Sequence, residues 1–242
     1  MTPIELEAER KLIIALDMPD AAEAYKFWQR LELRHAIAKI GLELLFSGGA
    51  ELARRLAREG AGVFVDAKLF DIGNTVERAT ARIAALGATF LTVHAQDQLT
   101  VEAAVRGRAG SKLKLLGVTL LTSTPPDSLG AQGVSLPAQE LVLRRAGFAM
   151  DAGFDGVVSS PLEAQALKQA FGSKLEVVCP GIRPRAAPAG DQARTATPAE
   201  AIRAGADYIV VGRPVTKAAG PAAAARAIIA EMAEALGGGQ PR

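Results

Sequence analysis

The sequence predicts a single α/β domain folded as a closed (β/α)8 barrel. Short runs of β-branched and aliphatic residues alternate along the chain with Ala-, Glu-, Arg- and Leu-rich stretches of helical character, and there are eight such pairs. This alternation favours parallel strands joined by right-handed crossover helices. The length of 242 residues, with 49% hydrophobic residues, is typical of one such barrel. We therefore expect one domain over residues 1–242, with an N-terminal extension at 1–10 and a flexible tail at 237–242.

The expected strands and helices follow in strict alternation. The apolar runs predict strands at residues 12–16, 36–40, 62–65, 90–93, 115–121, 156–158, 177–179 and 208–211. Helices are expected at residues 21–31, 44–59, 76–86, 99–108, 138–152, 161–171, 198–204 and 221–236. Three helices have a proline in their first turn, where the missing N–H costs no hydrogen bond, at Pro161, Pro198 and Pro221. Four have a glycine after their last residue, where a left-handed cap favours it, at Gly60, Gly87, Gly153 and Gly205.

Composition narrows the classes of partner. The net charge of +2 comes from 28 basic and 26 acidic residues that are scattered along the chain, so we expect no nucleic-acid partner. The single cysteine, Cys179, excludes an internal disulfide and a thiolate zinc site, which fits a reducing cytoplasm. Residues 1–10 lack the apolar segment of a signal peptide, and no apolar run reaches the roughly 18 residues of a membrane span. We expect a cytoplasmic protein that does not bind membranes.

The most informative stretch is residues 63–75, where a buried strand runs into charged residues. Asp66, Lys68 and Asp71 follow the apolar run at 63–65. Charge inside a protein is costly unless it is paired and hydrogen-bonded. Asp66 and Lys68 are two residues apart on an extended segment, so their side chains should point to the same face. We expect the chemistry of the protein at that face.

Polar residues also mark the carboxyl ends of the other expected strands. They are Asp17, Lys39, His94, Thr122, Ser159 and Ser160. In a barrel these strand ends form one ring, and active sites lie at that ring. The sequence therefore predicts that residues far apart along the chain meet in one site.

The charged members of this ring favour proton transfer. Asp17, Lys39, Asp66 and Lys68 would alternate in sign and keep each other ionised. A lysine that stays charged between carboxylates is a proton donor rather than an amine nucleophile, which favours proton delivery by Lys68. A carboxylate such as Asp66 would repel an anionic substrate group until its charge moves away, which suits loss of carbon dioxide. A purely structural ion-pair cluster remains the alternative.

The opposite side of the ring is expected to bind phosphate. In barrels the loops after strands 7 and 8 are a common phosphate site. The glycine of Gly212-Arg213 would let the backbone N–H approach an anion, and the arginine adds a forked donor. Arg183 follows strand 7, and the long loop at 183–197 carries Gln192 and Arg194. That loop and the one at 122–135 have lengths typical of lids or of disordered segments.

Other candidates have structural interpretations of comparable or greater weight. His94 is expected either to assist acid and base chemistry or to be a buried histidine bonded to a backbone carbonyl. Cys179 lies in an apolar strand and is expected to be a small core residue. The sequence contains no His, Cys and Asp cluster with metal-ligand spacing, so no metal site is expected.

Several motifs together resemble the orotidine 5'-phosphate decarboxylase family, in its short single-domain bacterial form. Asp66-Ala67-Lys68-Leu69-Phe70-Asp71-Ile72, followed by Asn74 and Thr75, resembles the family signature Asp-x-Lys-x-x-Asp-Ile. The other matching segments, in order, are Ala15-Leu16-Asp17, Lys39-Ile40-Gly41, Leu121-Thr122-Ser123, Pro180-Gly181-Ile182-Arg183-Pro184, Asp191-Gln192-x-Arg194 and Val211-Gly212-Arg213-Pro214. The resemblance covers essentially the whole chain.

The resemblance implies a carboxy-lyase that converts orotidine 5'-phosphate to uridine 5'-phosphate, the last step of de novo pyrimidine nucleotide synthesis, with no cofactor and no metal. By similarity Lys68 donates a proton to the pyrimidine carbon that loses the carboxylate, and Asp66 lies against that carboxylate. Asp17 and Lys39 bind the ribose hydroxyls and steady the charged network.

The resemblance also implies a homodimer with sites at its interface. Asp71, Ile72 and Thr75 would reach into the site of the partner. Thr122 would contact the base, and the phosphate side of the substrate would be bound by Pro180, Arg183, Gln192, Gly212 and Arg213.

Two other functions remain as alternatives. A magnesium-dependent sugar-phosphate decarboxylase or aldolase of the same barrel superfamily resembles this chain around 66–71, but the segments at 180–184 and 191–194 argue against it. A barrel that only binds a nucleotide is the other alternative. Such a binder would not need the costly charged set of Asp17, Lys39, Asp66 and Lys68.

Overall fold

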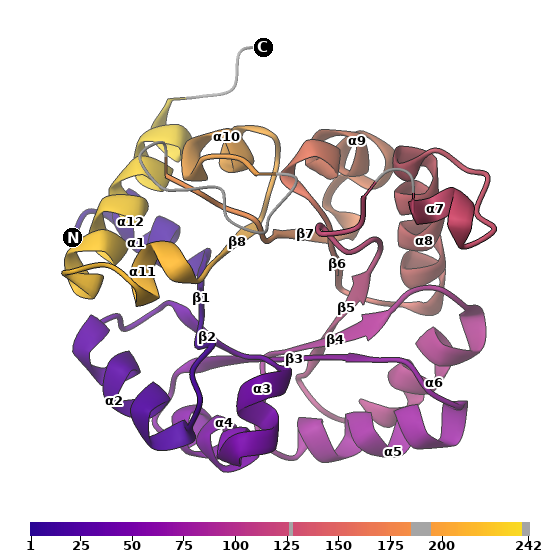
Figure 1. Cartoon of the computed structure of the whole chain (residues 1–242), viewed down its shortest axis with the longest axis horizontal. Coiled ribbons are helices and arrows are strands. Elements are labelled where there is room, and N and C mark those ends of the chain that lie inside the picture. The colour runs from indigo at the N-terminus through magenta and orange to yellow at the C-terminus, as the bar shows by residue number, and fades with distance from the viewer. Residues whose placement is uncertain (126–127, 185–194, 239–242) are drawn as a thin grey trace.

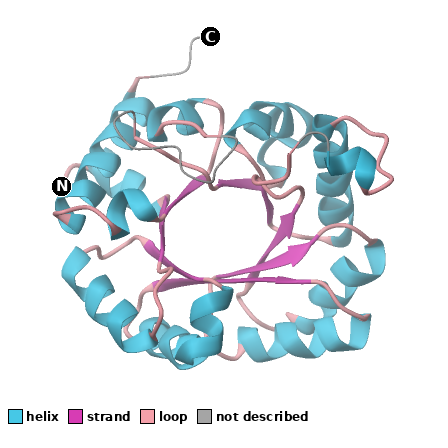
Figure 2. Ribbon diagram, viewed as in Figure 1, coloured by secondary structure: helices cyan, strands magenta, loops and turns pink. Residues whose placement is uncertain are grey.

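A computed structural model describes residues 1–125, 128–184 and 195–238, and it confirms the predicted barrel. Figures 1 and 2 show a ring of strands enclosed by helices. The strands are β1 (Leu12–Ala15), β2 (Ile37–Ile40), β3 (Gly62–Leu69), β4 (Phe90–His94), β5 (Lys114–Val118), β6 (Gly156–Val158), β7 (Glu176–Cys179) and β8 (Tyr208–Val211). Each strand pairs in parallel with the next, and β8 pairs with β1, which closes the barrel.

Eight of the helices correspond to those expected from the sequence. They are α2 (Ala21–Leu31), α4 (Ala50–Arg58), α5 (Gly73–Ala84), α6 (Gln98–Gly107), α8 (Ala138–Ala152), α9 (Pro161–Phe171), α10 (Pro198–Arg203) and α12 (Pro221–Gly237). Further helices lie in segments for which the sequence predicts none: α1 (Pro3–Arg10), α7 (Ser128–Ala131) and α11 (Arg213–Thr216). A short helix, α3 (Leu42–Leu44), overlaps the start of the helix predicted at 44–59. The added elements are short, so they carry too little periodicity to be recognised from sequence.

The hydrophobic core has two layers, as expected for strands that are covered on both faces. The barrel interior is filled by alternate residues of the strands: Ile13, Ala15, Ile37, Phe64, Phe90, Leu116, Val178 and Val210. The residues between them face outward into a larger cluster between strands and helices. Phe64 and Phe90 meet edge to face, with ring centroids 5.9 Å apart. They close the interior below the ring of polar strand ends.

The proline and glycine signals at helix boundaries agree with the structure. Pro161, Pro198 and Pro221 each occupy the first turn of a helix. The glycines after helix ends have left-handed backbones, with φ of +87° at Gly60, +85° at Gly87, +93° at Gly153 and +101° at Gly205. An L-residue with a β-carbon is disfavoured there, which explains the choice of glycine.

Two strand boundaries differ from the expected ones. β3 continues to Leu69 instead of ending at residue 65, because it resumes pairing with β4 after a register shift between Val65 and Leu69. β5 ends at Val118 rather than at residue 121. Its neighbour β6 ends at Val158, the partner of Val118, so the residues after Val118 have no strand to pair with on that side.

The prediction of one continuous helix over 44–59 is wrong. A π-helical turn, Leu45–Gly49, separates α3 from α4, and the backbone leaves helical geometry at Ser47 and Gly48. Gly48 has a φ of +93°. At Gly49 a β-carbon would lie 2.5 Å from the carbonyl oxygen of Leu44, so only glycine permits this close approach. The Ser-Gly-Gly sequence is the local cause of the break.

Residues 1–10, the predicted N-terminal extension, contain a helix that packs on the rest of the fold. Thr2 caps α1 through a capping box with Glu5. Figure 1 shows α1 beside α12, and Ala8 is fully buried. The buried carboxylate of Glu9 accepts hydrogen bonds from the backbone N–H groups of Arg34 (2.6 Å) and His35 (2.8 Å). At the other end α12 extends through Gly237, and residues 239–242 of the expected tail lie outside the described residues.

Candidate active site

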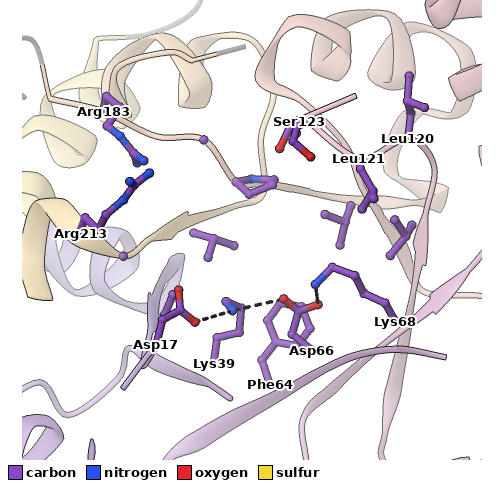
Figure 3. A pocket seen from close by; sticks show the side chains of 18 of the residues that line it. Asp17, Lys39, Phe64, Asp66, Lys68, Leu120, Leu121, Ser123, Arg183 and Arg213 are labelled. Atoms are coloured by element: carbon purple, nitrogen blue, oxygen red, sulfur yellow. Dashed lines mark hydrogen bonds and ion pairs between the residues drawn. The ribbon is translucent and has the colours of Figure 1, made fainter. Parts of the chain in front are cut away.

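A cavity of about 530 Å³ opens at the carboxyl ends of the strands. Figure 3 shows it from close by. Its lining comes from β1, β2, β3, β5, β6 and β8 and from the segments after β1, β5, β7 and β8. The lining residues are Ala15, Asp17, Lys39, Phe64, Asp66, Lys68, Val118, Leu120, Leu121, Thr122, Ser123, Val158, Pro180, Gly181, Arg183, Val210, Gly212, Arg213 and Lys217. Most of the predicted site residues therefore meet in one cavity.

One side of the cavity holds a chain of alternating charges. Lys39 Nζ lies 3.5 Å from Asp17 Oδ1 and 3.2 Å from Asp66 Oδ2. Lys68 Nζ lies 2.9 Å from Asp66 Oδ1. Figure 3 shows the four side chains as a continuous series of contacts. The charges alternate in sign along this series, as expected from the residues at the strand ends.

Lys39 and Lys68 differ in how much of each side chain is exposed. The side chain of Lys39 is 10% exposed and lies between two carboxylates, whereas that of Lys68 is 32% exposed. Lys39 occupies an inward-facing position on β2, two residues after Ile37, which places it deep in the barrel. Lys68, on the last part of β3, is the more accessible ammonium to a molecule in the cavity.

The alternating charges of Asp17, Lys39, Asp66 and Lys68 stabilise one another. Burial alone would raise the pKa of Asp66, but the ammonium groups of Lys39 and Lys68 outweigh it and hold the pKa of that carboxyl below its ordinary value. Burial alone would lower the pKa of Lys39, but the carboxylates of Asp66 and Asp17 raise it above its ordinary value. Both groups are therefore ionised at neutral pH.

The other side of the cavity carries two guanidinium groups. Figure 3 shows the side chains of Arg183 and Arg213 directed toward each other across the cavity from Lys68. Gly181 precedes Arg183 with a φ of +78°, in the left-handed region that glycine tolerates. Lys217, at the end of α11, adds a further ammonium to this side. This end of the cavity is suited to bind an anion.

Three predicted site residues lie outside the cavity of their own chain. Asp71, Ile72 and Thr75 are exposed, and Ile72 is 73% accessible. They lie where β3 leads into α5, beyond the strand end. Asp71 Oδ1 accepts a hydrogen bond from the backbone N–H of Ile72 (2.7 Å). Within one chain these residues do not line the cavity that contains Lys68.

Another predicted residue, Gln192, lies outside the described residues, as do Asp191 and Arg194 of the same motif. The described ends of that segment approach each other. The backbone N–H of Arg183 donates to the carbonyl of Ala196 (2.9 Å), and Ile182 forms a β-bridge with Ala196. This contact fixes Arg183 at the edge of the cavity.

The weaker candidates from the strand ends lie beside the cavity rather than in its lining. His94 Nδ1 lies 3.3 Å from the side-chain amide of Gln96, and the imidazole packs edge to face on Phe70. This contact of the ring is with a side chain, whereas the structural interpretation expected a backbone carbonyl. Burial, together with the charge of Lys68, lowers the pKa of His94, so the ring is neutral at pH 7.

Buried hydroxyl and thiol groups after β6 and in β7 have structural positions. Ser159 donates to the buried carboxylate of Glu163 (3.3 Å), and Ser160 caps α9. Cys179 is fully buried in β7, and burial raises the pKa of its thiol. It is the small core residue that the sequence indicates.

Sequence reasoning assigned no role to Ser123 or Lys217, which line the cavity, or to Thr92, which contacts the charged chain from behind. Ser123 directly follows the predicted Thr122, and Lys217 lies one helical turn after Arg213, so proximity to predicted residues was the available signal. No local signal marks Thr92, because its position depends on the pairing of β3 with β4.

The described part of the chain contains no group of three His, Cys, Asp or Glu side chains arranged to hold a metal ion. Within the same residues, no helix combines the length and hydrophobicity needed to span a membrane. The described cavity thus offers an ammonium group on a carboxylate at one end and paired guanidinium groups at the other. Such a site can bind an anionic molecule and transfer a proton to it.

Comparison with known proteins gives concordant results. A family model described as "Orotidine 5'-phosphate decarboxylase / HUMPS family" matches residues 10–228. Relatives named orotidine 5'-phosphate decarboxylase include one from Bradyrhizobium diazoefficiens, 51% identical over 98% of this chain and 100% of the relative, and one from Rhodopseudomonas palustris strain BisA53, 52% identical over 94% and 96%. A crystal structure of orotidine 5'-phosphate decarboxylase from Lactobacillus acidophilus is similar with a TM-score of 0.82 and 38% identity, covering 92% of this chain and 99% of that one.

Proposed function

The chain belongs to the orotidine 5'-phosphate decarboxylase / HUMPS family, and we propose that the cavity at the carboxyl ends of its strands is where it decarboxylates orotidine 5'-phosphate to uridine 5'-phosphate. The observation that carries the proposal is the chain of contacts from Asp17 through Lys39 and Asp66 to Lys68, which lies opposite Arg183 and Arg213 in one cavity. The reaction is the carboxy-lyase step that ends de novo synthesis of uridine 5'-phosphate.

The two ends of the cavity match the two anionic ends of the substrate. Arg183 and Arg213 bind the phosphate, with the backbone at Pro180 and Gly212 beside them. Gln192, which lies outside the described residues, is assigned to the phosphate by the resemblance of its motif to the family. Asp17 and Lys39 bind the ribose hydroxyls, and Thr122 contacts the base. The pyrimidine carboxylate then lies against Asp66 and Lys68.

The chemical step uses electrostatic repulsion and one proton. Asp66 is kept ionised by Lys39 and Lys68, so it repels a substrate carboxylate placed beside it. When the bond from the ring carbon to the carboxyl group breaks, carbon dioxide leaves and the electron pair stays on the ring carbon. The ammonium of Lys68 donates its proton to that carbon, and the resulting amine regains a proton from solvent. The proposed step uses no cofactor.

We also propose a homodimer in which each subunit completes the site of the other. Large exposed apolar side chains lie in the segments after the neighbouring strands β2, β3 and β4, namely Leu42, Phe46, Phe70, Ile72 and Leu99. Exposed apolar side chains in such number are typical of protein interfaces. Asp71 and Thr75 lie in the same region and outside their own cavity, so a second copy of the chain seated there receives them in its site. Interface formation thus explains both observations.

A cytoplasmic location agrees with the single buried cysteine, and the balanced, scattered charge supports the absence of a nucleic-acid partner. Two alternatives remain, a magnesium-dependent sugar-phosphate decarboxylase or aldolase and a barrel that only binds a nucleotide. Each predicts an assay result that differs from that of the proposed decarboxylase.

Turnover of orotidine 5'-phosphate by the purified protein in excess chelator tests the proposed function. The absorbance of the orotate ring should disappear, and uridine 5'-phosphate should form in equal amount. A sensor would bind the nucleotide without turnover. A magnesium-dependent enzyme would act only when the metal is restored. Either result would contradict the proposal.

The phosphate assignment makes a separate prediction. Arg213→Ala should lower kcat/KM for orotidine 5'-phosphate roughly ten- to a hundredfold, because a charge-assisted contact to phosphate is lost. This factor corresponds to a loss of about 1.5–3 kcal/mol of transition-state stabilisation. Activity on orotidine, which has no phosphate, should change little. Arg203→Ala, an exposed arginine at the end of α10, is the matched control. Equal losses on both substrates would show that Arg213 does not bind the phosphate.

A further inference from the structure

β3 is irregular at the two residues that are central to the proposed chemistry. Its register with β4 passes from Val65 opposite Leu91 to Leu69 opposite Val93, so β3 has extra residues there. Such a bulge bends the strand and re-aims its side chains. Lys68 lies within the bulge and has a φ of +47°, in the left-handed region that a residue with a β-carbon rarely adopts. Another interaction must hold this conformation in place.

The hydroxyl of Thr92, on β4 opposite the bulge, supplies that interaction. It accepts a hydrogen bond from the backbone N–H of Lys68 (2.9 Å) and donates one to Asp66 Oδ1 (2.9 Å). Asp66 Oδ1 also lies 2.9 Å from Lys68 Nζ. These contacts form a closed ring from the Lys68 backbone through the Thr92 hydroxyl and the Asp66 carboxylate to the Lys68 ammonium.

Thr92 has no access to the cavity itself. It is fully buried and is not among the residues that line the cavity. A buried hydroxyl does not by itself require such contacts: Thr80, on α5, is equally buried, and its Oγ1 has no hydrogen-bond partner among the described residues. The two hydrogen bonds of Thr92 are therefore specific to its position behind Asp66 and Lys68.

We propose that Thr92 is a positioning residue for the decarboxylation, because its single hydroxyl fixes the Asp66 carboxylate and the Lys68 backbone relative to each other. This inference rests on the proposed function. Proton transfer and electrostatic repulsion both depend on distances set to a fraction of an ångström. The hydroxyl sets them at two points, one on the carboxylate and one on the strand that carries the ammonium.

The isosteric change Thr92→Val tests this role. It keeps the branched shape but leaves the Lys68 N–H without its acceptor and Asp66 without one donor. The value of kcat should fall about ten- to a hundredfold, which corresponds to the usual cost of unmade buried hydrogen bonds. KM should change much less, because the contacts proposed for phosphate and ribose are not touched. Thr92→Ser retains the hydroxyl and should recover most of kcat.

The controls separate positioning from packing. Thr80→Val makes the same substitution at an equally buried site and should leave kcat and KM unchanged. Thr92→Ala is a second hydroxyl-free variant in case valine prevents folding, and thermal unfolding shows which variants are folded. If Thr92→Ser and Thr92→Val lose kcat equally, or if a folded Thr92→Val variant has normal kcat, Thr92 is not a positioning residue. Either result would leave the proposed function intact. An inactive wild-type protein would overturn the proposed function and the assignment with it.

Discussion

Lys68→Ala should abolish the decarboxylation of orotidine 5'-phosphate, with a fall in kcat of about 10⁴-fold or more because general-acid catalysis and charge compensation are lost together. Lys68 is the more exposed of the two ammonium groups on Asp66, and its side chain faces the cavity. Lys39 cannot replace it from its position, since it is held between Asp17 and Asp66 deeper in the barrel. Turnover is measured from the loss of orotate absorbance in the presence of chelator.

Two further variants distinguish proton donation from a structural ion pair. Lys68→Arg keeps a positive charge but replaces the ammonium with a group whose pKa is too high for efficient donation, so it should also be inactive. Lys26→Ala removes an exposed lysine from α2 and should have normal activity. Both Lys68 variants should still bind uridine 5'-phosphate. If Lys68→Ala loses both product binding and folding stability, the ion pairs among Asp17, Lys39, Asp66 and Lys68 have a structural role, and Lys68 is not the proton donor.

Mixing two inactive variants should restore activity if sites are shared between subunits. Asp71→Asn should be inactive as a homodimer, because the carboxylate that it contributes to the partner is lost. In a mixed dimer with Lys68→Ala, one site receives both defects and the other receives neither. Random exchange of equal amounts in a two-fold symmetric dimer should give about a quarter of wild-type activity. The measurement is turnover after co-refolding or co-expression of the two variants.

The matched control uses two residues of the same site. Asp66 and Lys68 contact each other within one chain, so a mixture of Asp66→Asn and Lys68→Ala leaves every site with at least one defect. That mixture should stay inactive. Recovery in this control, or no recovery with Asp71→Asn when mixed dimers have formed, would contradict the assignment of Asp71 to the partner's site.

The sequence by itself determined the architecture and indicated which residues meet in the cavity at the strand ends. Alternating strand and helix patterns, with prolines at helix starts and glycines at helix ends, are local signals, and the structure confirms the barrel that they predict. Polar residues at strand ends are also visible locally, and parallel closure necessarily brings them to one face. Asp17, Lys39, Asp66 and Lys68 can therefore be grouped from their sequence positions alone, and all four line the cavity.

Only the tertiary structure decided how these groups are aimed. The sequence around Asp66 and Lys68 predicts a strand that ends before them, whereas β3 continues through a bulge that turns the Lys68 backbone to positive φ. The bulge depends on which residue of β4 lies opposite, and this register is a property of two strands, not of one segment. Thr92 shows the consequence, because its role follows from its place across the bulge and not from any feature of its own strand.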